Sequence, residues 1–516
     1  MAARLELRPG SLTLGELRRL HAGSARLHLP EAPRAAIRAS SDLVQRVAVG
    51  SEPVYGINTG FGKLADKRID DSALEALQLN LIRSHSAGVG EPLGAPVVRL
   101  MLAIKAASLA RGYSGVRESL VDALVAAYNA GALPYVPAQG SVGASGDLAP
   151  LAHMTLALMG EGELLEDGRR VPAAEGLARH GLAPLRLLAK EGLALINGTQ
   201  TSTALALHAL FSFMPVLEAA LVIGALTVDA ARGSDGPFDP RIHALRGQPG
   251  QIDVAACYRA LLAGSAIRQS HLTGDDRVQD PYCLRCQPQV VGACLDQLRH
   301  GAEVLLREAN AVTDNPLVFA ADGELVSGGN FHAEPVALTA DAMAVAIAEI
   351  GAISERRIAM LIDASVSRLP PFLSAEPGLN SGFMIAHVTA ASLASENKSL
   401  AHPASVDSLP TSANQEDHVS MATFAARRLQ RLIDNTAYIL GIEYLASAQA
   451  LEFLRPLRSS GPLEEAHALL RRACAAMPHD RYLAPDIEKA TGLVRDGSVA
   501  AILKAMQELP PLWIPG

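Results

Sequence analysis

Residues 201–230 read TSTALALHALFSFMPVLEAALVIGALTVDA, an apolar stretch with the spacing of an α-helix. Between residues 203 and 228 only His208 and Glu218 can carry a charge, so the segment is apolar and long enough to span a bilayer. Pro215 and Glu218 lie near its middle, however, and no cluster of Lys or Arg flanks it, which is unlike a membrane span. We therefore expect a helix buried in a large helical core, with no membrane association.

The same periodicity recurs along the chain and predicts a mainly α fold. Apolar residues at i, i+3, i+4 and i+7 dominate windows at residues 72–84, 116–130, 288–312, 333–362, 382–400 and 418–450. The longest windows exceed ordinary globular helices, which favours a bundle of long helices around one core. Strand signals are short. Residues 163–169, with Asp167-Gly168, and 317–326, with Asp322-Gly323, predict two small surface hairpins.

The length of the chain predicts more than one domain. Its first part has shorter apolar periods and is broken by several glycines. We expect a smaller mixed N-terminal domain over residues 1–113, which carries Tyr55 and His85. A long-helix bundle domain should follow over residues 114–516, with the boundary near residues 111–115.

Composition excludes several classes of protein. A formal net charge of −8 and a pI near 6.0 offer no basic footprint for nucleic acid. Five widely spaced cysteines do not form a disulfide framework, and they suit a reducing compartment. Residues 1–20 are interrupted by charges and Pro9, and they lack the apolar run of a signal peptide. We expect a cytoplasmic protein without a nucleic-acid partner.

Residues 140–147 read GSVGASGD, and every residue but Val142 is small or favours turns. A dinucleotide-binding loop needs a strand followed by Gly-x-Gly-x-x-Gly, and these glycines have a different spacing. A serine-hydrolase elbow needs Gly-x-Ser-x-Gly, and this run is one residue short. From composition alone a tight turn remains open, with Asp147 at the start of the apolar helix 148–159.

The run Ala144-Ser145-Gly146-Asp147, followed by Leu-Ala-Pro-Leu-Ala-His at 148–153, resembles the signature of the aromatic amino acid ammonia-lyases. In that family Ala-Ser-Gly cyclises into 4-methylideneimidazol-5-one. The resemblance implies that the nitrogen of Gly146 attacks the carbonyl carbon of Ala144 and that Ser145 loses its hydroxyl to form an alkene. Each residue type suits this role, because glycine offers an unhindered nitrogen and a permissive backbone, and alanine adds no bulk. A helix N-terminus nearby would make the group more electrophilic.

The resemblance extends over roughly residues 5 to 500, with no departure at any motif position. The further motifs are Tyr55-Gly56-Ile57-Asn58-Thr59-Gly60-Phe61-Gly62, Ser84-His85, Asn197-Gly198-Thr199-Gln200, Gln279-Asp280-Pro281-Tyr282-Cys283-Leu284-Arg285, Gly328-Gly329-Asn330-Phe331-His332 and Asn414-Gln415-Glu416-Asp417-His418. Any one of these residues alone would be structural more often than catalytic. Their occurrence together and in order supports a catalytic reading.

Ser84-His85 and Glu416 resemble the branch of the family that acts on histidine. The resemblance then implies non-oxidative elimination of ammonia from L-histidine to give trans-urocanate. An imidazole both donates and accepts hydrogen bonds, so a histidine and a carboxylate suit it, whereas a phenyl ring would leave both unpaired. Whether the amine or the imidazole ring of the substrate attacks the cofactor stays open at this stage.

The resemblance also implies individual roles. Tyr55 is the candidate base for the β-proton, and as a phenol it needs a positive field to act near neutral pH. Arg285 is expected to grip the substrate carboxylate with help from Asn197. The remaining assignments are support of the cofactor and its oxyanion by Gln279 and Tyr282, packing by Phe331, contact with the imidazole by His85 and Glu416, and proton acceptance from the departing amine by Glu416.

These residues come from distant segments, and the family resemblance implies a homotetramer whose active sites each draw on three subunits. No metal is expected. Cys283 and Cys286 have the spacing of a metal or redox pair but no second pair nearby, and His153, His332 and His418 lack ligand spacing. Two alternatives stay open, namely a tyrosine or phenylalanine lyase or aminomutase of the same family, and a helical scaffold without catalysis.

Overall fold

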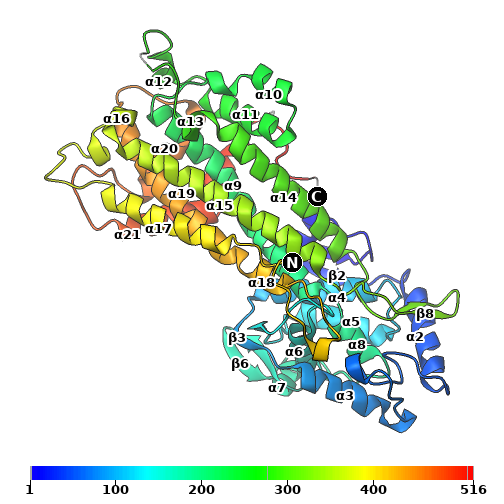
Figure 1. Ribbon diagram of the computed structural model, residues 1–516. Helices are drawn as coiled ribbons and strands as arrows, with labels where there is room; N and C mark the ends of the chain where they lie inside the picture. Colours follow the sequence, from blue (N-terminus) through cyan, green and yellow to red (C-terminus); the bar gives the residue numbers. More distant parts are fainter. Residues whose placement is uncertain (1–2, 276, 508, 515–516) are drawn as a thin grey trace.

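Long helices dominate the computed structural model, which describes residues 3–275, 277–507 and 509–514 (Figure 1). The mainly α fold predicted from the sequence is confirmed. The bundle is built from α9 (Gln200–Ala230), α14 (Gln287–Ala309), α15 (Glu334–Ile362), α17 (Met384–Leu400) and α19 (Leu429–Glu452). These helices run side by side along one elongated body, and α9 lies among them.

Helix α9 is the axis of the core. It packs against α15 and α19 and, near the N-terminal part of the chain, against α4 (Ala95–Leu109). Two helices of the described chain, α9 and α15, are long and apolar enough to cross a membrane by composition, but 89% and 72% of their apolar windows are buried inside the protein. The burial predicted for residues 201–230 is confirmed, and Pro215 lies within the continuous helix.

Shorter helices occupy the two ends of the bundle (Figure 1). One end carries α10 (Pro240–Arg246), α11 (Pro249–Leu262), α12 (Ala266–Gln269) and α13 (Tyr282–Arg285). The other end carries α2 (Arg34–Ala48), α3 (Leu74–His85), α5 (Glu118–Ala130), α6 (Leu148–Leu158), α7 (Ala173–Arg179) and α8 (Glu191–Ile196). The remaining helices are α1 (Leu14–Ala22), α16 (Ala364–Ser367), α18 (Ala422–Arg427), α20 (Gly461–Ala473), α21 (Ala484–Arg495) and α22 (Ser498–Ala505).

The helix predicted over residues 418–450 is wrong at its start. The chain forms α18 only from Ala422, and α19 begins at Leu429. The reason is that the preceding segment pairs with the glycine-rich loop. The amide of Met421 donates to the carbonyl oxygen of Val142 at 2.8 Å, and the hydroxyl of Ser420 donates to that of Gly143 at 2.8 Å.

The strands of the described chain form four two-stranded sheets. The two predicted hairpins are confirmed as β5 (Glu163–Glu166) with β6 (Arg169–Pro172) and β7 (Leu317–Phe319) with β8 (Glu324–Val326). Two further pairs, β1 (Ala3–Glu6) with β2 (Ala25–His28) and β3 (Val89–Pro92) with β4 (Pro137–Gln139), were not predicted, because helices separate their strands and no short hairpin turn joins them. Strands β3 and β4 pair with each other although they lie on opposite sides of residue 113 in the sequence. The division of the chain into two domains at this residue stays a prediction.

A buried ion pair joins four helices in the middle of the bundle. Arg357 of α15 and Glu443 of α19 are 1% and 0% exposed, and Nη2 lies 2.7 Å from Oε2. The Glu443 carboxylate also accepts a hydrogen bond from Thr227 of α9, and Arg357 donates to Gln287 of α14 at 3.0 Å. Each charge is therefore compensated only while its partner is present.

Glu443→Gln should lower the free energy of unfolding by about 3–5 kcal/mol, because it leaves the Arg357 guanidinium buried without a countercharge. Urea unfolding followed by circular dichroism measures the loss. Glu303→Gln is the control, since it removes the same group from an exposed pair with Arg307 at 3.2 Å and should change stability by less than about 0.5 kcal/mol. Equal losses in the two variants would contradict the importance of the buried pair.

Candidate active site

The loop 140–147 connects β4 to α6 and lies against the break between α8 and α9. Gly146 has φ of +75°, and a Cβ atom there would lie 2.2 Å from the carbonyl oxygen of Gly198. The amide of Asp147 donates to that same oxygen at 2.8 Å. Both the backbone conformation and this close approach therefore require glycine at position 146.

Asp147 precedes α6, as expected, but its side chain does not cap that helix. Its carboxylate instead accepts from the backbone amide of Ser202 at 2.7 Å, in the first turn of α9, and from the hydroxyl of Thr423 at 2.7 Å. The expected capping of α6 is therefore wrong, because Asp147 stabilises the N-terminus of a neighbouring helix. The N-terminal ends of α6 and α9 consequently meet at the loop.

Asn197 lies in the three-residue break before α9 and contacts the loop directly. Its Nδ2 donates to the carbonyl oxygen of Ser145 at 2.8 Å. Its Oδ1 is buried and has no hydrogen-bond partner among the described residues. The side chain is thus placed to hold the Ser145 carbonyl with one atom and to accept from a ligand with the other.

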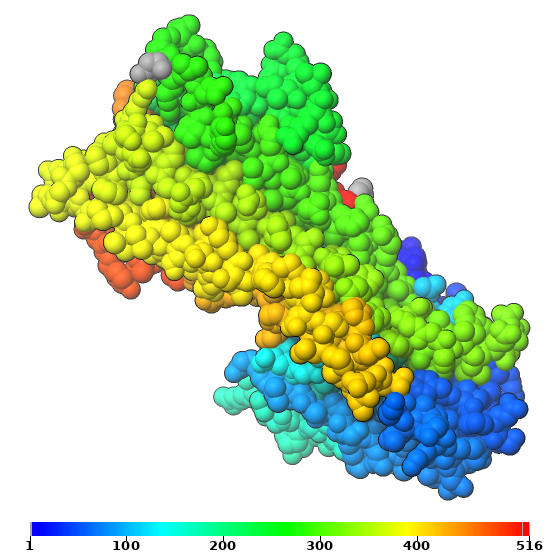
Figure 2. Space-filling view, viewed as in Figure 1, coloured from blue at the N-terminus to red at the C-terminus, as the bar shows by residue number. Residues whose placement is uncertain are grey.

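One cavity of about 960 Å³ opens onto the loop. Seven of the eleven residues singled out from the sequence line it, and they are Tyr55, His85, Ala144, Ser145, Asn197, Phe331 and Glu416. Gly146 is buried directly beside them. In Figure 2 the yellow-orange segment near residue 410 lies over the blue N-terminal part of the chain, which brings Glu416 to residues far away in the sequence.

Glu416 contacts the central serine of the loop. The hydroxyl of Ser145 donates to Oε1 at 2.6 Å, and the hydroxyls of Thr411 and Ser412 donate to Oε2 at 2.7 and 2.9 Å. Burial raises the pKa of the Glu416 carboxyl, but these three hydrogen bonds outweigh it and bring the pKa below its usual value. Glu416 is therefore an ionised carboxylate, ready to accept a proton.

His85 is held at the end of α3 as a neutral imidazole. Its Nδ1 lies 2.9 Å from the carbonyl oxygen of Leu81, so this nitrogen carries the proton and donates. Burial lowers the pKa of His85, while this hydrogen bond and the charge of Glu416 oppose the shift. Its Nε2 is left as a hydrogen-bond acceptor.

The phenol of Tyr55 is protonated in the isolated chain. Burial raises its pKa, the hydrogen bond from the amide of Gly62 at 3.5 Å lowers it, and the negative charge of Glu416 raises it further. The described cations do not offset this rise in the pKa, although Lys63 and Lys67 also line the cavity. A positive charge brought close to the phenol would lower its pKa and let Tyr55 act as a base.

Gln279, Tyr282 and Arg285 lie beyond the other end of α9. Gln279 and Arg285 line a separate cavity of about 350 Å³, and the 31 residues of α9 between the two ends correspond to about 45 Å. Arg277 anchors this segment by donating to the carbonyl oxygen of Ala231, just past α9. A single chain therefore does not bring these three residues to the loop.

Within the described chain, no acidic side chain forms an ion pair with Arg285. Its guanidinium carbon lies 4.6 Å from the ring centre of Tyr282, which is 71% exposed. The side chain of Arg285 makes no hydrogen bond or ion pair with any residue that the structure describes, and its Nε is buried without a partner. A fork of donors without an acceptor is suited to bind a carboxylate.

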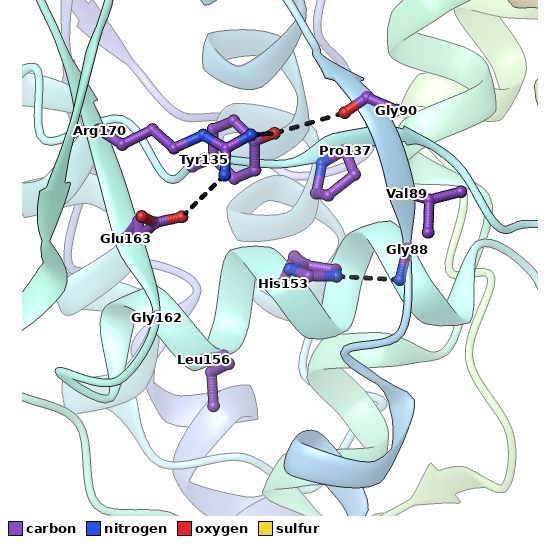
Figure 3. A pocket seen from close by; sticks show the side chains of 10 residues that line it. All are labelled: Gly88, Val89, Gly90, Tyr135, Pro137, His153, Leu156, Gly162, Glu163 and Arg170. Atoms are coloured by element: carbon purple, nitrogen blue, oxygen red, sulfur yellow. Dashed lines mark hydrogen bonds and ion pairs between the residues drawn. The ribbon is translucent and has the colours of Figure 1, made fainter.

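The histidines considered as possible ligands have ordinary partners. His153 accepts from the amide of Gly88 at 3.0 Å, beside a smaller cavity whose wall includes Tyr135 and Arg170 (Figure 3). The ring of His332 stacks on that of His418. Cys283 and Cys286 are free thiols, and no group of three or more His, Cys, Asp or Glu side chains is arranged to hold a metal within the described ranges.

Sequence reasoning missed the residues that support the site. Thr411 and Ser412 hold Glu416 through a turn in which Ser412, Ala413 and Asn414 have positive φ angles. No local pattern announces such a turn, because these residues seldom adopt it. Lys105, in the apolar helix α4, was also missed, although a charged residue within an apolar stretch of sequence is unusual and could have been noticed.

The chain is similar to known proteins over most of its length. The family model for aromatic amino acid lyases matches residues 12–472. The chain is similar to a histidine ammonia-lyase of Aromatoleum aromaticum, with 63% identity over 494 residues that cover 96% of this chain and 94% of that protein.

Two solved structures are similar over their whole length. A histidine ammonia-lyase of Trypanosoma cruzi has a TM-score of 0.88 and 42% identity, covering 97% of this chain and 95% of that one. A tyrosine aminomutase of Streptomyces globisporus has a TM-score of 0.92 and 35% identity, covering 99% and 100%. The aminomutase has the higher TM-score and the lyase the higher identity, so shape alone does not separate the two activities.

Gly146→Ala should destabilise the protein more than Gly131→Ala. Both positions have positive φ, which costs a side chain about 1–2 kcal/mol, but Gly131 has open space around it. At Gly146 the added Cβ also meets the backbone of Gly198, which cannot move cheaply. Urea unfolding of both variants measures the difference, and equal losses would show that the contact is unimportant.

Proposed function

The chain belongs to the aromatic amino acid lyase family, and on that premise we propose that it eliminates ammonia from L-histidine to give trans-urocanate. The observation that carries the proposal is that His85 and Glu416 line the same cavity as Ser145. The Nε2 of a neutral His85 and the ionised carboxylate of Glu416 both accept hydrogen bonds, so they suit the ring N–H of a substrate imidazole, which a phenyl ring lacks. The similar proteins named as histidine ammonia-lyases support the same substrate.

The proposed cofactor is 4-methylideneimidazol-5-one formed from Ala144-Ser145-Gly146. The local geometry fits this group, because Gly146 has the conformation and lack of bulk that ring closure needs and Ser145 faces the cavity. Asn197 donates to the Ser145 carbonyl, which would become the carbonyl of the ring. Once formed, the group supplies an electrophilic methylidene that activates an amino acid for loss of ammonia.

Two helix N-termini contribute partial positive charge near that position. The N-terminal ends of α6 and α9 both lie at the loop, and the amides at a helix N-terminus carry partial positive charge. Negative charge that develops on the Ser145 oxygen would therefore be stabilised by Asn197 and by these helix ends.

Proton transfer is assigned to Tyr55, whose pKa is raised, and to Glu416, whose pKa is lowered. Tyr55 would take the β-proton, but burial and Glu416 raise its pKa in the isolated chain. A cation from another copy of the chain would lower that pKa and permit the role. Glu416 is already ionised, so it can hold the substrate imidazole and accept a proton from the departing amine.

The position of Arg285 supports a homotetramer with shared active sites. Its fork of donors has no acceptor among the described residues, and it lies beyond the opposite end of α9 from Ser145. Two copies packed along their bundles in opposite directions would bring the Arg285 end of one to the loop of the other. Arg285 would then bind the substrate carboxylate beside Ser145, with help from Asn197, and Gln279 would support the cofactor.

Ser145→Ala should reduce turnover at least about a thousandfold, or about 4 kcal/mol in the activation barrier, because alanine has no hydroxyl to lose. The function itself is tested by ultraviolet detection of urocanate, with histidine, tyrosine and phenylalanine offered in parallel. Mass spectrometry of the unmutated protein should find the peptide that contains Ser145 lighter by two waters. An active protein with an unmodified peptide would overturn the cofactor, and turnover of tyrosine alone would favour an aminomutase or tyrosine lyase.

Substrate choice should depend on Ser84 and His85. Replacing them by Phe and Leu removes a polar partner of the imidazole and adds apolar surface. The ratio of kcat/KM for histidine to that for phenylalanine should fall by about one to two decades, the effect of roughly 1–3 kcal/mol for an unpaired buried group. The ratio cancels general damage to the fold, so an unchanged ratio would remove the residue-level basis for histidine.

Arg285→Lys should raise KM for histidine about tenfold, because an ammonium cannot reproduce the two parallel hydrogen bonds of a guanidinium. Steady-state kinetics measure the change, and the peptide that contains Ser145 serves as a control because it should keep its modified mass. Unchanged KM and kcat would mean that Arg285 does not bind the carboxylate.

A further inference from the structure

Lys105 is a charged residue buried without a charged partner in contact. It lies in the apolar helix α4 and is 1% exposed. Its Nζ donates to two backbone carbonyl oxygens, those of Ala194 at 3.1 Å and Asn197 at 2.7 Å. It makes no ion pair with any residue in the described part of the chain. Removing an ammonium from water costs free energy, and interactions with the protein must compensate for this cost.

Ala194 lies in the last turn of α8, and Asn197 directly follows that helix. Helix α8 stops at Ile196 and α9 starts at Gln200, so the last carbonyls of α8 have no amide partners within the helix. A cation at a helix C-terminus is favourable because it satisfies these acceptors and opposes their partial negative charge. Lys105 therefore holds the backbone at the break that carries Asn197.

Three charged residues act on Lys105 from nearby, and they are Asp314, Asp147 and Lys190. Burial lowers the pKa of its ammonium to about 7, the carboxylates of Asp314 and Asp147 oppose that shift, and the charge of Lys190 adds to it. Asp314 is itself paired with Lys190 at 2.7 Å, and Asp147 accepts only from neutral donors. Asp147 thus supplies uncompensated negative charge on the side of the loop.

A continuous path of hydrogen bonds leads from Lys105 to the reacting loop. The ammonium binds the carbonyl oxygen of Asn197, and the side chain of the same Asn197 donates to the carbonyl oxygen of Ser145. We propose that Lys105 is a positioning residue for the conversion of Ala144-Ser145-Gly146, acting by fixing Asn197 on the Ser145 carbonyl. The inference rests on the proposed function, since it assumes that this conversion takes place.

The conversion needs no oxidant. A bond forms between the nitrogen of Gly146 and the carbonyl carbon of Ala144, and the Ala144 oxygen leaves as water with the hydrogens of the Gly146 and Ser145 nitrogens. Ser145 then loses its Cα hydrogen and its hydroxyl as a second water, which leaves the alkene. That Cα hydrogen is adjacent to the Ser145 carbonyl, so a donor on this oxygen stabilises the charge that forms as the hydrogen is removed.

Lys105→Met keeps an unbranched side chain, one atom shorter than that of lysine, but removes its donors. In the full chain, isolated soon after synthesis and again after incubation, the peptide that contains Ser145 should lose its two waters at least tenfold more slowly than in the unmutated protein. Lys105→Gln keeps an amide donor and should convert at an intermediate rate, and it preserves the test if the Met variant does not fold. Conversion of the variants at the unmutated rate would overturn the inference.

A double-mutant cycle distinguishes positioning from general damage. If Lys105 acts through Asn197, then adding Lys105→Met to Asn197→Ala should slow conversion by less than twofold, whereas independent effects would multiply and contradict the inference. Glu443→Gln is the matched control for lost stability. Its partner Thr227 lies 27 residues along α9 from Gln200, about 40 Å from the break, so this variant should convert fully.

The outcomes also separate this inference from the proposed function. An unmodified mass in the unmutated protein would overturn both. A modified mass without release of urocanate would overturn only the substrate. A modified mass together with normal conversion of Lys105→Met would overturn only the role of Lys105.

Discussion

The contact between Gly146 and Gly198 is the constraint on which the site depends. Two backbones meet so closely that a Cβ at position 146 would lie 2.2 Å from the Gly198 oxygen. The same contact places the amide of Asp147 on that oxygen and the side chain of Asn197 on the Ser145 carbonyl. Helices α6 and α9 both start here, so the loop sits between two positive helix ends. The close packing of Gly146 on Gly198 therefore fixes both the start of the two helices and the position of the reacting loop.

The length of the bundle keeps two parts of the site apart within one chain. Because α9 is straight enough to run as one helix for 31 residues, it separates Ser145 at one end from Arg285 at the other. Within one chain Tyr55 is protonated and Glu416 is ionised, and Lys63 and Lys67 are exposed lysines in the wall of the cavity. Arg285, beyond the far end of α9, offers a guanidinium whose Nε is buried without a partner among the described residues. Antiparallel packing of copies would complete the site.

Sequence periodicity was sufficient for the long helices, because burial imposes a repeat on segments of that length, and Asp-Gly turns indicated the two hairpins. It failed at His418 to Met421, where contacts with Val142 and Gly143 override the apolar pattern. The residues of the cavity could be named from motif resemblance, yet their contacts could not. Nothing local indicates that Asp147 stabilises α9 rather than α6, or that Thr411 and Ser412 hold Glu416, since these are contacts between distant segments.

Complementation between two inactive chains tests the shared site most directly. Ser145→Ala and Arg285→Ala chains, carrying different tags, are produced together, and assemblies that contain both are isolated. If each site combines the loop of one copy with Arg285 of another, about a quarter of the sites in randomly mixed assemblies are intact, and about a quarter of the unmutated activity should return. Mixed assemblies with no more activity than either variant alone would contradict the account.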